Sequence, residues 1–249
     1  MINIIYIYII ISTLMFADEP ISLVTKTRGI TKYKISSESK FRSNAQVNTP
    51  IFHGNGIKTK AKSFAKIVYL DDRSTVSLYP KTEVMIHGAI EQRMINKQVD
   101  IFYGIVRINV FNQINAIFKL TTPYSELTCY ECEFWVISNQ ESGDYFYKIS
   151  GNALVTNPSM IDKIELIEDS TLSSIKDTKI TMFKTTFDEN QYLGSLILNA
   201  NEFINMSEEE LKKQSKIVNQ SKESTTNIVE IRFTNAMNIE RTIYLTYIK

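Results

Sequence analysis

Along most of the chain, apolar and polar side chains alternate residue by residue. The pattern is clear in Val106–Val110 and in Ala116–Leu120. Successive side chains of a β-strand point to opposite faces, so a two-residue period predicts half-buried strands. Such segments recur from Lys26 to Asn157, about 8–12 residues apart, separated by polar turns such as Asp71–Ser74. The pattern therefore predicts a mainly β protein, either an antiparallel sandwich or a solenoid-like β roll, and argues against a βαβ enzyme core.

The N-terminal segment Ile2–Phe16 is almost wholly apolar and is followed by Asp18-Glu19-Pro20. It is shorter than the about 20 residues that a helix needs to cross a bilayer. This arrangement is typical of a secretory signal peptide, which we predict over residues 1–17 with cleavage after Ala17. The alternatives are an uncleaved N-terminal anchor and a buried strand, because Ile and Tyr favour β-structure. We expect a periplasmic or extracellular protein without a transmembrane span after the signal.

The alternating pattern changes near Pro158. We therefore expect residues 18–158 to form one β domain, in which the strand series closes, and residues 159–249 to form a smaller α+β region. Early in that region, Thr178–Phe187 and Tyr192–Leu198 are predicted to be strands, because they are rich in residues that favour β-structure.

One helix is predicted in the C-terminal region, near residues 207–218. Ser207 and Glu210 have the spacing of a capping box, in which each side chain binds the other residue's backbone amide at a helix N-terminus. Two further strands, Asn227–Phe233 and Glu240–Ile248, are expected to close the chain as a hairpin.

The turns and strands of the first domain follow an order that resembles the FecR domain family of bacterial periplasmic proteins. The resemblance covers about half of the chain and depends on a collinear series of short motifs. Arg73 stands where the family has a turn glycine, and Glu131-Cys132 stand where it has Gly-Thr. The motifs are Arg28-Gly29-Ile30, Gly54–Thr59, Ser63-Phe64-Ala65, Leu70–Ser74, Leu78–Val84, Gly104-Ile105-Val106, Thr121-Thr122-Pro123, Glu131–Val136 and Gly151–Val155.

This resemblance implies an extracytoplasmic β module used for sensing or interaction. The family has no catalytic residues, so the resemblance implies none in this sequence. The best-known relatives are anti-sigma regulators, which carry a sigma-binding segment and a transmembrane helix before this domain. Here the β domain follows directly after the signal-like segment. We therefore do not expect the sigma-binding role in this chain.

Cys129 and Cys132 form a Cys-x-x-Cys motif and are the only cysteines. In an exported protein such a motif can be a disulfide, two buried thiols or a redox pair. Redox chemistry favours a helix N-terminus, which stabilises the thiolate, whereas this motif precedes a predicted strand. A disulfide requires a bulge or turn, because residues three apart in a regular strand point to opposite faces. We rank a local disulfide first, buried thiols second and a redox catalyst last.

A basic cluster, Lys58, Lys60, Lys62 and Lys66, is a candidate for partner binding. Even-numbered residues share one face if this segment is a strand. Such a face fits an anionic glycan, a phospholipid head group or an acidic protein. The alternative is a solvated outward face of the sheet, for which lysine is common.

Trp135 is the only tryptophan and a second candidate. Adjacent residues of a strand face opposite sides, and Phe134 matches a core position of the FecR-like pattern. We therefore expect Trp135 on the outer face, where an indole ring can anchor a carbohydrate or a protein partner. The alternative is that Trp135 packs under a neighbouring loop.

The amino-acid composition argues against nucleic-acid binding, metal binding and thiol–imidazole catalysis. The 28 Lys and Arg residues balance 27 Asp and Glu residues, so no strong positive field favours nucleic acid. The only two histidines, His53 and His87, and the two cysteines leave little for a metal site or a thiol–imidazole pair. We expect no cofactor, no metal and no nucleic-acid partner.

These features predict an exported, non-catalytic β module that binds an envelope protein or an envelope polymer, with envelope sensing as one form of that role. The alternative is an envelope enzyme, either a glycan-directed hydrolase or a thiol oxidoreductase using Cys129 and Cys132. Glycan hydrolysis needs converging carboxylates, and the sequence contains no pairing that identifies them. A third hypothesis is a signalling accessory that acts with a membrane partner.

Overall fold

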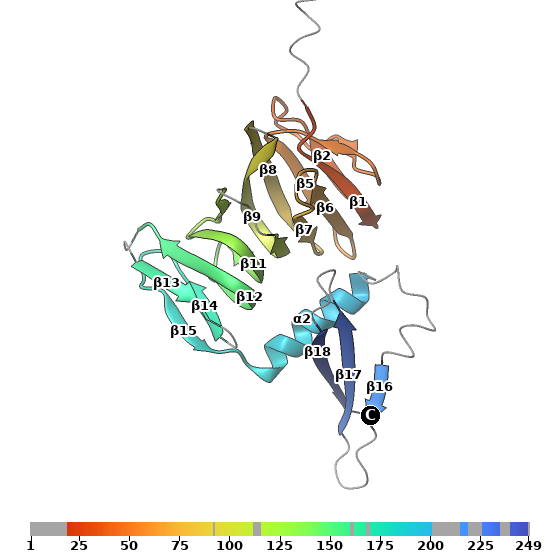
Figure 1. Cartoon of the computed structure of the whole chain (residues 1–249), viewed down its shortest axis with the longest axis vertical. Coiled ribbons are helices and arrows are strands. Elements are labelled where there is room, and N and C mark those ends of the chain that lie inside the picture. Colours follow the sequence, from red (N-terminus) through yellow and green to blue (C-terminus); the bar gives the residue numbers. More distant parts are fainter. Residues whose placement is uncertain are drawn as a thin grey trace, which may run out of the picture. The chain divides into compact units, whose positions relative to one another are not determined.

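The structure is a computed structural model that describes residues 19–91, 93–111, 116–159, 162–167, 170–200, 215–218, 226–234 and 240–248. The chain divides into two compact units, the first ending at Phe183 and the second beginning at Lys184 (Figure 1). The predicted signal segment, residues 1–17, lies outside the described residues. Among the residues that are described, no helix is long and apolar enough to cross a membrane.

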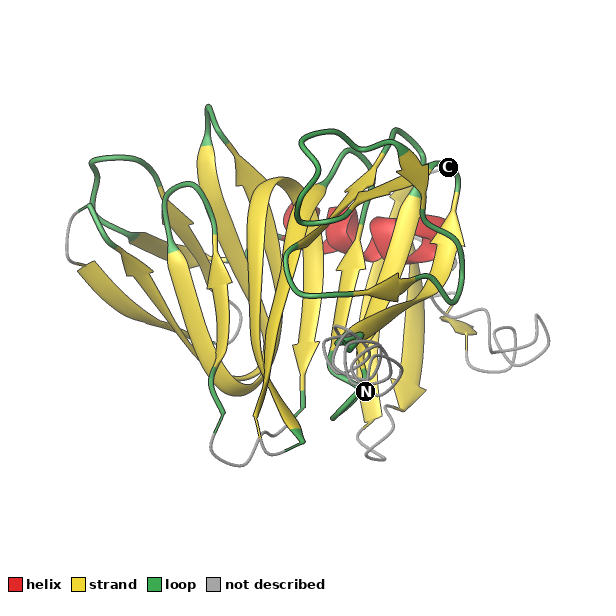
Figure 2. Ribbon diagram, turned by 90° about the horizontal axis from the view of Figure 1, so that it is seen from above, coloured by secondary structure: helices red, strands yellow, loops and turns green. Residues whose placement is uncertain are grey.

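Strands make up most of the described chain, as Figure 2 shows, and the predicted mainly β class is confirmed. The first unit is formed by one 15-stranded sheet, whose last strand ends at Lys184, the first residue of the second unit. Its strands are β1 (Ser22–Arg28), β2 (Thr31–Lys34), β3 (Ser43–Asn44), β4 (Pro50–Ile51), β5 (Asn55–Thr59), β6 (Phe64–Tyr69), β7 (Thr75–Leu78), β8 (Glu83–Glu91), β9 (Met94–Val110), β10 (Phe118–Thr121), β11 (Glu126–Asn139), β12 (Gly143–Asn157), β13 (Asp162–Leu166), β14 (Ser170–Ser174) and β15 (Thr181–Lys184). Where a register is described the pairs of this sheet are antiparallel, apart from the parallel pair of β9 and β10.

The sheet folds into two layers because three long strands change partners along their length. Strand β9 pairs with β8 through its first half and with β7 and β11 through its second half. Strand β11 pairs first with β10 and then with β9, and β12 pairs first with β14 and then with β13. The two layers are therefore β3-β2-β5-β8-β9-β10-β11-β12-β13 and β4-β1-β6-β7-β9-β11-β12-β14-β15.

Each long strand has a local irregularity where it passes between the layers. Gly104 of β9 has a φ of 112°, and Gly151 of β12 has a φ of 76°, which residues with a Cβ rarely adopt. Between Cys129 and Cys132, the register of β11 shifts so that two of its residues face one residue of β12. Glycines and bulges of this kind bend strands at the corners of packed sheets.

The core lies between the two layers and draws on the inward positions of both. Alternate residues of each strand enter it, as the two-residue period predicts. Its fully buried members from the first layer include Ile57, Val84, Ile86, Val99, Leu120, Leu127 and Val155, and those from the second include Val24, Ile67, Val76, Val106, Ile108, Phe134, Phe146 and Leu172.

The first unit extends beyond the predicted domain boundary at residue 158. Strands β13 and β14 both pair with β12, and their residues Leu166 and Leu172 are fully buried in the core. Pro158, the predicted boundary between domains, therefore lies in a turn of the sheet. The misinterpretation has a physical reason, since a proline that interrupts an alternating pattern marks a hairpin turn as readily as a linker.

The second unit contains helix α2 (Phe187–Ala200) and an antiparallel sheet of β16 (Ser215–Val218), β17 (Thr226–Thr234) and β18 (Glu240–Ile248). The two predicted closing strands are confirmed as the hairpin β17–β18. Of the helix predicted near 207–218, residues 215–218 form β16, and the remaining residues lie outside those described.

The prediction of a strand over Tyr192–Leu198 is wrong, because this segment belongs to α2. The helix begins with a capping box that was not predicted. The backbone N–H of Thr186 donates to Glu189 Oε2 at 2.7 Å, and the N–H of Glu189 donates to Thr186 Oγ1 at 3.2 Å. Buried Leu193 and Ile197 follow at helical spacing.

Candidate functional site: a basic patch around Phe41

Four outward side chains stand in register across β2, β5, β8 and β9. Lys32 lies opposite Lys58, Lys58 opposite Glu83, and Glu83 opposite Tyr103. Residues directly opposite each other in an antiparallel pair share a face, with Cβ atoms roughly 5 Å apart. The pairing of strands thus gathers these groups from residues far apart in the chain.

Phe41, from the segment between β2 and β3, lies next to Lys58 of this row and to Lys34 of β2. The Nζ atoms of Lys34 and Lys58 lie 5.0 Å and 5.7 Å from the centroid of its ring. At such distances the ring face attracts a cation. A Cβ on Gly56 would lie 2.9 Å from Lys34 Cε and 3.1 Å from Phe41 Cε1, so glycine provides the space for both side chains.

The charges of this surface are only partly neutralised. Glu83 accepts from Lys58 Nζ at 2.8 Å and from the Tyr103 hydroxyl at 3.0 Å. Hydrogen bonding to Glu83 and Tyr103 raises the pKa of Lys58, even though burial opposes the shift. Lys58 therefore keeps its positive charge at neutral and alkaline pH.

The segment around Phe41 adds further cations. Residues 32–42 contain Lys32, Lys34, Lys40 and Arg42 and one carboxylate, Glu38. Lys40 and Arg42 flank the ring in the chain and are exposed, and Lys32 Nζ donates to the Arg42 carbonyl at 3.5 Å. We call the side chains of Lys32, Lys34, Lys40, Phe41, Arg42 and Lys58 the Phe41 patch.

The lysine cluster predicted from the sequence is divided by the fold. Only Lys58 lies in the Phe41 patch. Lys60 and Lys62 lie in the exposed turn between β5 and β6, and Lys66 lies on β6, which belongs to the second layer. Because the Ser63 N–H donates to the Lys60 carbonyl at 3.3 Å, the chain turns there and the even-numbered positions do not share one strand face.

The expected exposure of Trp135 is wrong, because this residue is only 3 % exposed. As predicted, Phe134 belongs to the core between the layers and Trp135 lies on the other face of its strand. The indole ring contacts Tyr79, with ring centroids 4.8 Å apart, and the Arg107 guanidinium lies 5.8 Å from its centroid. Trp135 therefore packs within the protein and is not available as a surface anchor in this structure.

Cys129 and Cys132 are joined by a disulfide and are both buried. The bulge of β11 brings both side chains to the core side, with Cα atoms 6.2 Å apart, whereas Tyr130 and Glu131 between them are exposed. Opposite the bulge stands Gly151, and a Cβ there would lie 2.7 Å from Cys132 Cα. Bulge, disulfide and glycine thus form one corner of the sandwich.

The two histidines, distant in the chain, meet at β8. The ring centroids of His53 and His87 lie 5.2 Å apart, and His87 Nε2 lies 2.8 Å from Asp100 Oδ2. Burial favours a raised pKa for Asp100, but hydrogen bonds from His87 and Gln98 outweigh it and lower the pKa. Over the described residues, no group of three or more His, Cys, Asp or Glu side chains has the arrangement of a metal site.

Comparison with known proteins gives little similarity. No protein-family model and no curated protein matches the sequence. Two crystal structures of a "putative anti-sigma factor" from Parabacteroides distasonis resemble part of the chain, each with 17% sequence identity and a TM-score of 0.47. Each comparison covers 57% of this chain, and 63% or 64% of the neighbour. The chain thus spans less than two thirds of the length of these neighbours, and no residue role is transferred from them.

Proposed function

We propose that this chain is an exported, non-catalytic β module that binds an anionic polymer or protein of the cell envelope through the Phe41 patch. The observation that supports this most is that Lys34 and Lys58 converge on one aromatic ring, while Lys32 stands opposite Lys58 in the neighbouring strand. Cations held on a regular sheet bind an anion without first being ordered, which lowers the entropic cost of association.

Other charged groups of the first unit are held in internal ion pairs. The buried Lys97 ammonium lies 2.6 Å from Asp71 Oδ2 and 3.2 Å from Asp72 Oδ2. Arg107 Nε donates to Glu133 Oε1 at 3.1 Å. These pairs stabilise strands and turns of the first unit, which is a structural use of their charge.

Export is supported by the apolar N-terminal segment, which is followed by Asp18-Glu19-Pro20. The FecR-like order of motifs in the first unit supports an extracytoplasmic interaction role as well. Mature protein from an envelope fraction should begin near Asp18. Recovery of intact Met1 from the cytoplasm would contradict export.

Binding is tested with the mature chain on sensors coated with lipopolysaccharide, which is anionic. Sensors coated with uncharged dextran serve as the comparison. We expect lipopolysaccharide to bind and its affinity to fall with added salt. The double variant Lys32→Gln/Lys34→Gln should weaken binding about tenfold, since exposed charge contacts are worth up to about 1 kcal/mol each.

The matched control is Lys60→Gln/Lys62→Gln, which removes the same charge from the neighbouring turn. It should change the affinity by less than about twofold. Equal losses in both double variants would indicate attraction by net charge and would contradict a defined patch. Binding by neither anionic polymers nor acidic envelope proteins would refute the proposed function.

The non-catalytic part of the proposal has its own test. A thiol oxidoreductase would reduce insulin or rearrange scrambled disulfides. We expect the wild type to do neither, because Cys129 and Cys132 are buried in the core, where a thiolate is poorly accessible. Turnover by the wild type that disappears in the Cys129→Ser/Cys132→Ser variant would establish the enzyme alternative.

A further inference from the structure

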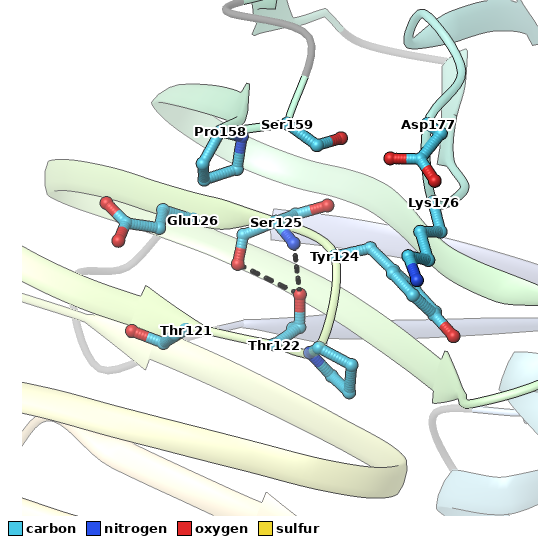
Figure 3. Close-up of a pocket in the computed structure, with 10 residues that line it drawn as sticks. Thr121, Thr122, Tyr124, Ser125, Glu126, Pro158, Ser159, Lys176 and Asp177 are labelled. Carbon is cyan, nitrogen blue, oxygen red and sulfur yellow. Dashed lines mark hydrogen bonds between the residues drawn. The ribbon is translucent and has the colours of Figure 1, made fainter.

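A pocket of about 490 Å³ lies where three turns of the first unit meet (Figure 3). It shares no residue with the Phe41 patch. The turns are those between β10 and β11, between β12 and β13, and between β14 and β15. Its lining residues are Thr121, Thr122, Pro123, Tyr124, Ser125, Glu126, Pro158, Ser159, Lys176 and Asp177. Pockets of roughly 300–1,000 Å³ hold small ligands.

A buried carboxylate fixes the first turn from beneath. Asp144 is fully buried and accepts from Thr122 Oγ1 at 2.6 Å, from Ser138 Oγ at 2.7 Å and from the Tyr124 N–H at 3.1 Å. Burial raises its pKa, although these donors oppose the shift. Thr122 Oγ1 is also bonded to the backbone of Ser125, as Figure 3 shows.

A single buried amide fixes the other two turns. Asn157 Nδ2 donates to the carbonyls of Ile175 and Thr178, each at 3.1 Å, and so holds the turn that carries Lys176 and Asp177. Asn157 Oδ1 accepts from the Ser159 N–H at 3.1 Å. Asn157 and Asp144 do not line the pocket, so their contacts serve to preorganise the groups that do.

The pocket is lined by an aromatic ring and by hydrogen-bonding side chains of both positive and negative charge. The Tyr124 hydroxyl donates to the Gln140 carbonyl, which fixes the ring at the pocket while leaving it partly exposed. Glu126 and Asp177 contribute carboxylates and Lys176 an ammonium. A ligand of one charge would meet a like charge here, whereas a polyol can donate to the carboxylates and accept from the ammonium. The apolar face of a sugar ring packs on an aromatic ring.

We infer that this pocket binds a neutral saccharide unit, with Tyr124 as the stacking residue and Lys176 and Asp177 as hydrogen-bonding partners of its hydroxyl groups. The site goes beyond the proposed anionic interaction, because a neutral sugar gains nothing from the charge of the Phe41 patch. The two sites can therefore be tested independently.

The test uses the full mature chain and isothermal titration calorimetry. The probes are chitotriose and maltotriose as neutral sugars, and Ala-Ala-Ala as a zwitterionic peptide. We expect a trisaccharide to bind. Tyr124→Ala should lower the affinity for it about tenfold, which corresponds to about 1.4 kcal/mol of binding free energy from stacking. The matched control is Tyr130→Ala, which removes a tyrosine that is 56 % exposed on the bulge of β11 and should leave the affinity unchanged.

A second variant decides the outcome if Tyr124→Ala does not fold. Asp177 has a φ of 55°, which glycine adopts freely, so Asp177→Gly removes the carboxylate and keeps the backbone. Asp177→Gly should also lower the affinity for the trisaccharide several-fold, whereas Lys32→Gln/Lys34→Gln should leave it unchanged. Binding of neither trisaccharide, binding of the peptide alone, or affinities unaffected by changes at Tyr124 and Asp177 would overturn the inference without bearing on the Phe41 patch.

Discussion

In the turn Asp71–Ser74, carboxylate side chains support a backbone conformation that usually requires glycine. Arg73 has a φ of 67°, in the left-handed region that favours glycine. The turn is held instead by Asp72, whose carboxylate accepts from the Ser74 N–H at 2.8 Å and from Ser74 Oγ at 2.7 Å. Asp71 binds the buried Lys97. Carboxylate contacts thus offset the strain at Arg73.

Replacing Arg73 with glycine should stabilise the protein. The left-handed conformation costs a residue with a Cβ about 1–2 kcal/mol, and glycine removes this cost. Part of the gain is offset, because glycine loses more conformational entropy on folding. We expect the free energy of unfolding in urea to rise by about 0.5–1 kcal/mol. The control is Arg73→Ala, which keeps the strain and should not stabilise the protein. Equal stability of the glycine and alanine variants would refute the strain argument.

The lowered pKa of Asp100 predicts a pH dependence of stability. Because the folded state holds this carboxyl below its ordinary value of 3.8, its ionised form stabilises the fold above that value. The stabilisation should be lost as the pH falls through the lowered pKa. The difference in unfolding free energy between wild type and Asp100→Asn should therefore be greatest near neutrality and shrink in acid. A difference that stays constant with pH would contradict this assignment.

At the scale of elements, three corners determine how the strands form layers. Strands β9, β11 and β12 each serve both layers, and they bend at Gly104, at the disulfide-linked bulge and at Gly151. Gly104 and Gly151 both fall in motifs of the FecR-like series, whose order alone did not predict a bend. Their role as bends explains why glycine is required there.

Gly151→Ala should disrupt the corner opposite the bulge. The added Cβ would meet backbone atoms of β11 at the bulge and would place alanine at a φ of 76°. We expect the free energy of unfolding to fall by about 3 kcal/mol, from backbone strain and steric overlap together. The neighbouring exposed Asn152 provides the control, since Asn152→Ala should change stability by less than about 0.5 kcal/mol. Similar small effects of both substitutions would contradict a tight corner.

The sequence predicted local structure well and spatial neighbours poorly, for a physical reason. Alternation is a property of adjacent residues, and so the strand series was recognisable without knowledge of the fold. The Phe41 patch depends on pairing between β2 and β5, and of the predicted lysines only Lys58 belongs to it. The helix α2 was missed although Thr186 and Glu189 have the same spacing as the capping box predicted at Ser207.

At the scale of the molecule, the sandwich of the first unit is completed by β13 and β14, beyond the predicted boundary at residue 158. The core residues Leu166, Leu172 and Ile180 are contributed by the segment that a shorter domain would lack. Each buried side chain of this kind contributes about 1.5–3 kcal/mol, so their sum is comparable with the stability of a whole domain.

Truncation tests where the first unit ends. Residues 18–183 should unfold in a single cooperative transition, followed by circular dichroism during heating. Residues 18–158 should give a β-type spectrum without a cooperative transition, because the core loses one side of β12. A cooperative melt of the shorter fragment at the same temperature would show that β13 and β14 are accessory to the core.

The sharing of long strands between layers also governs how quickly the first unit can form. The halves of β9 find their partners in different layers, so neither layer can be completed before the other has begun. Such pairings join residues distant in the chain, as with β1 and β6, and the entropy of closing those loops is lost before the contacts form. Folding should therefore be slow, on the order of milliseconds to seconds, and unpaired strand edges and apolar side chains would stay exposed during that time.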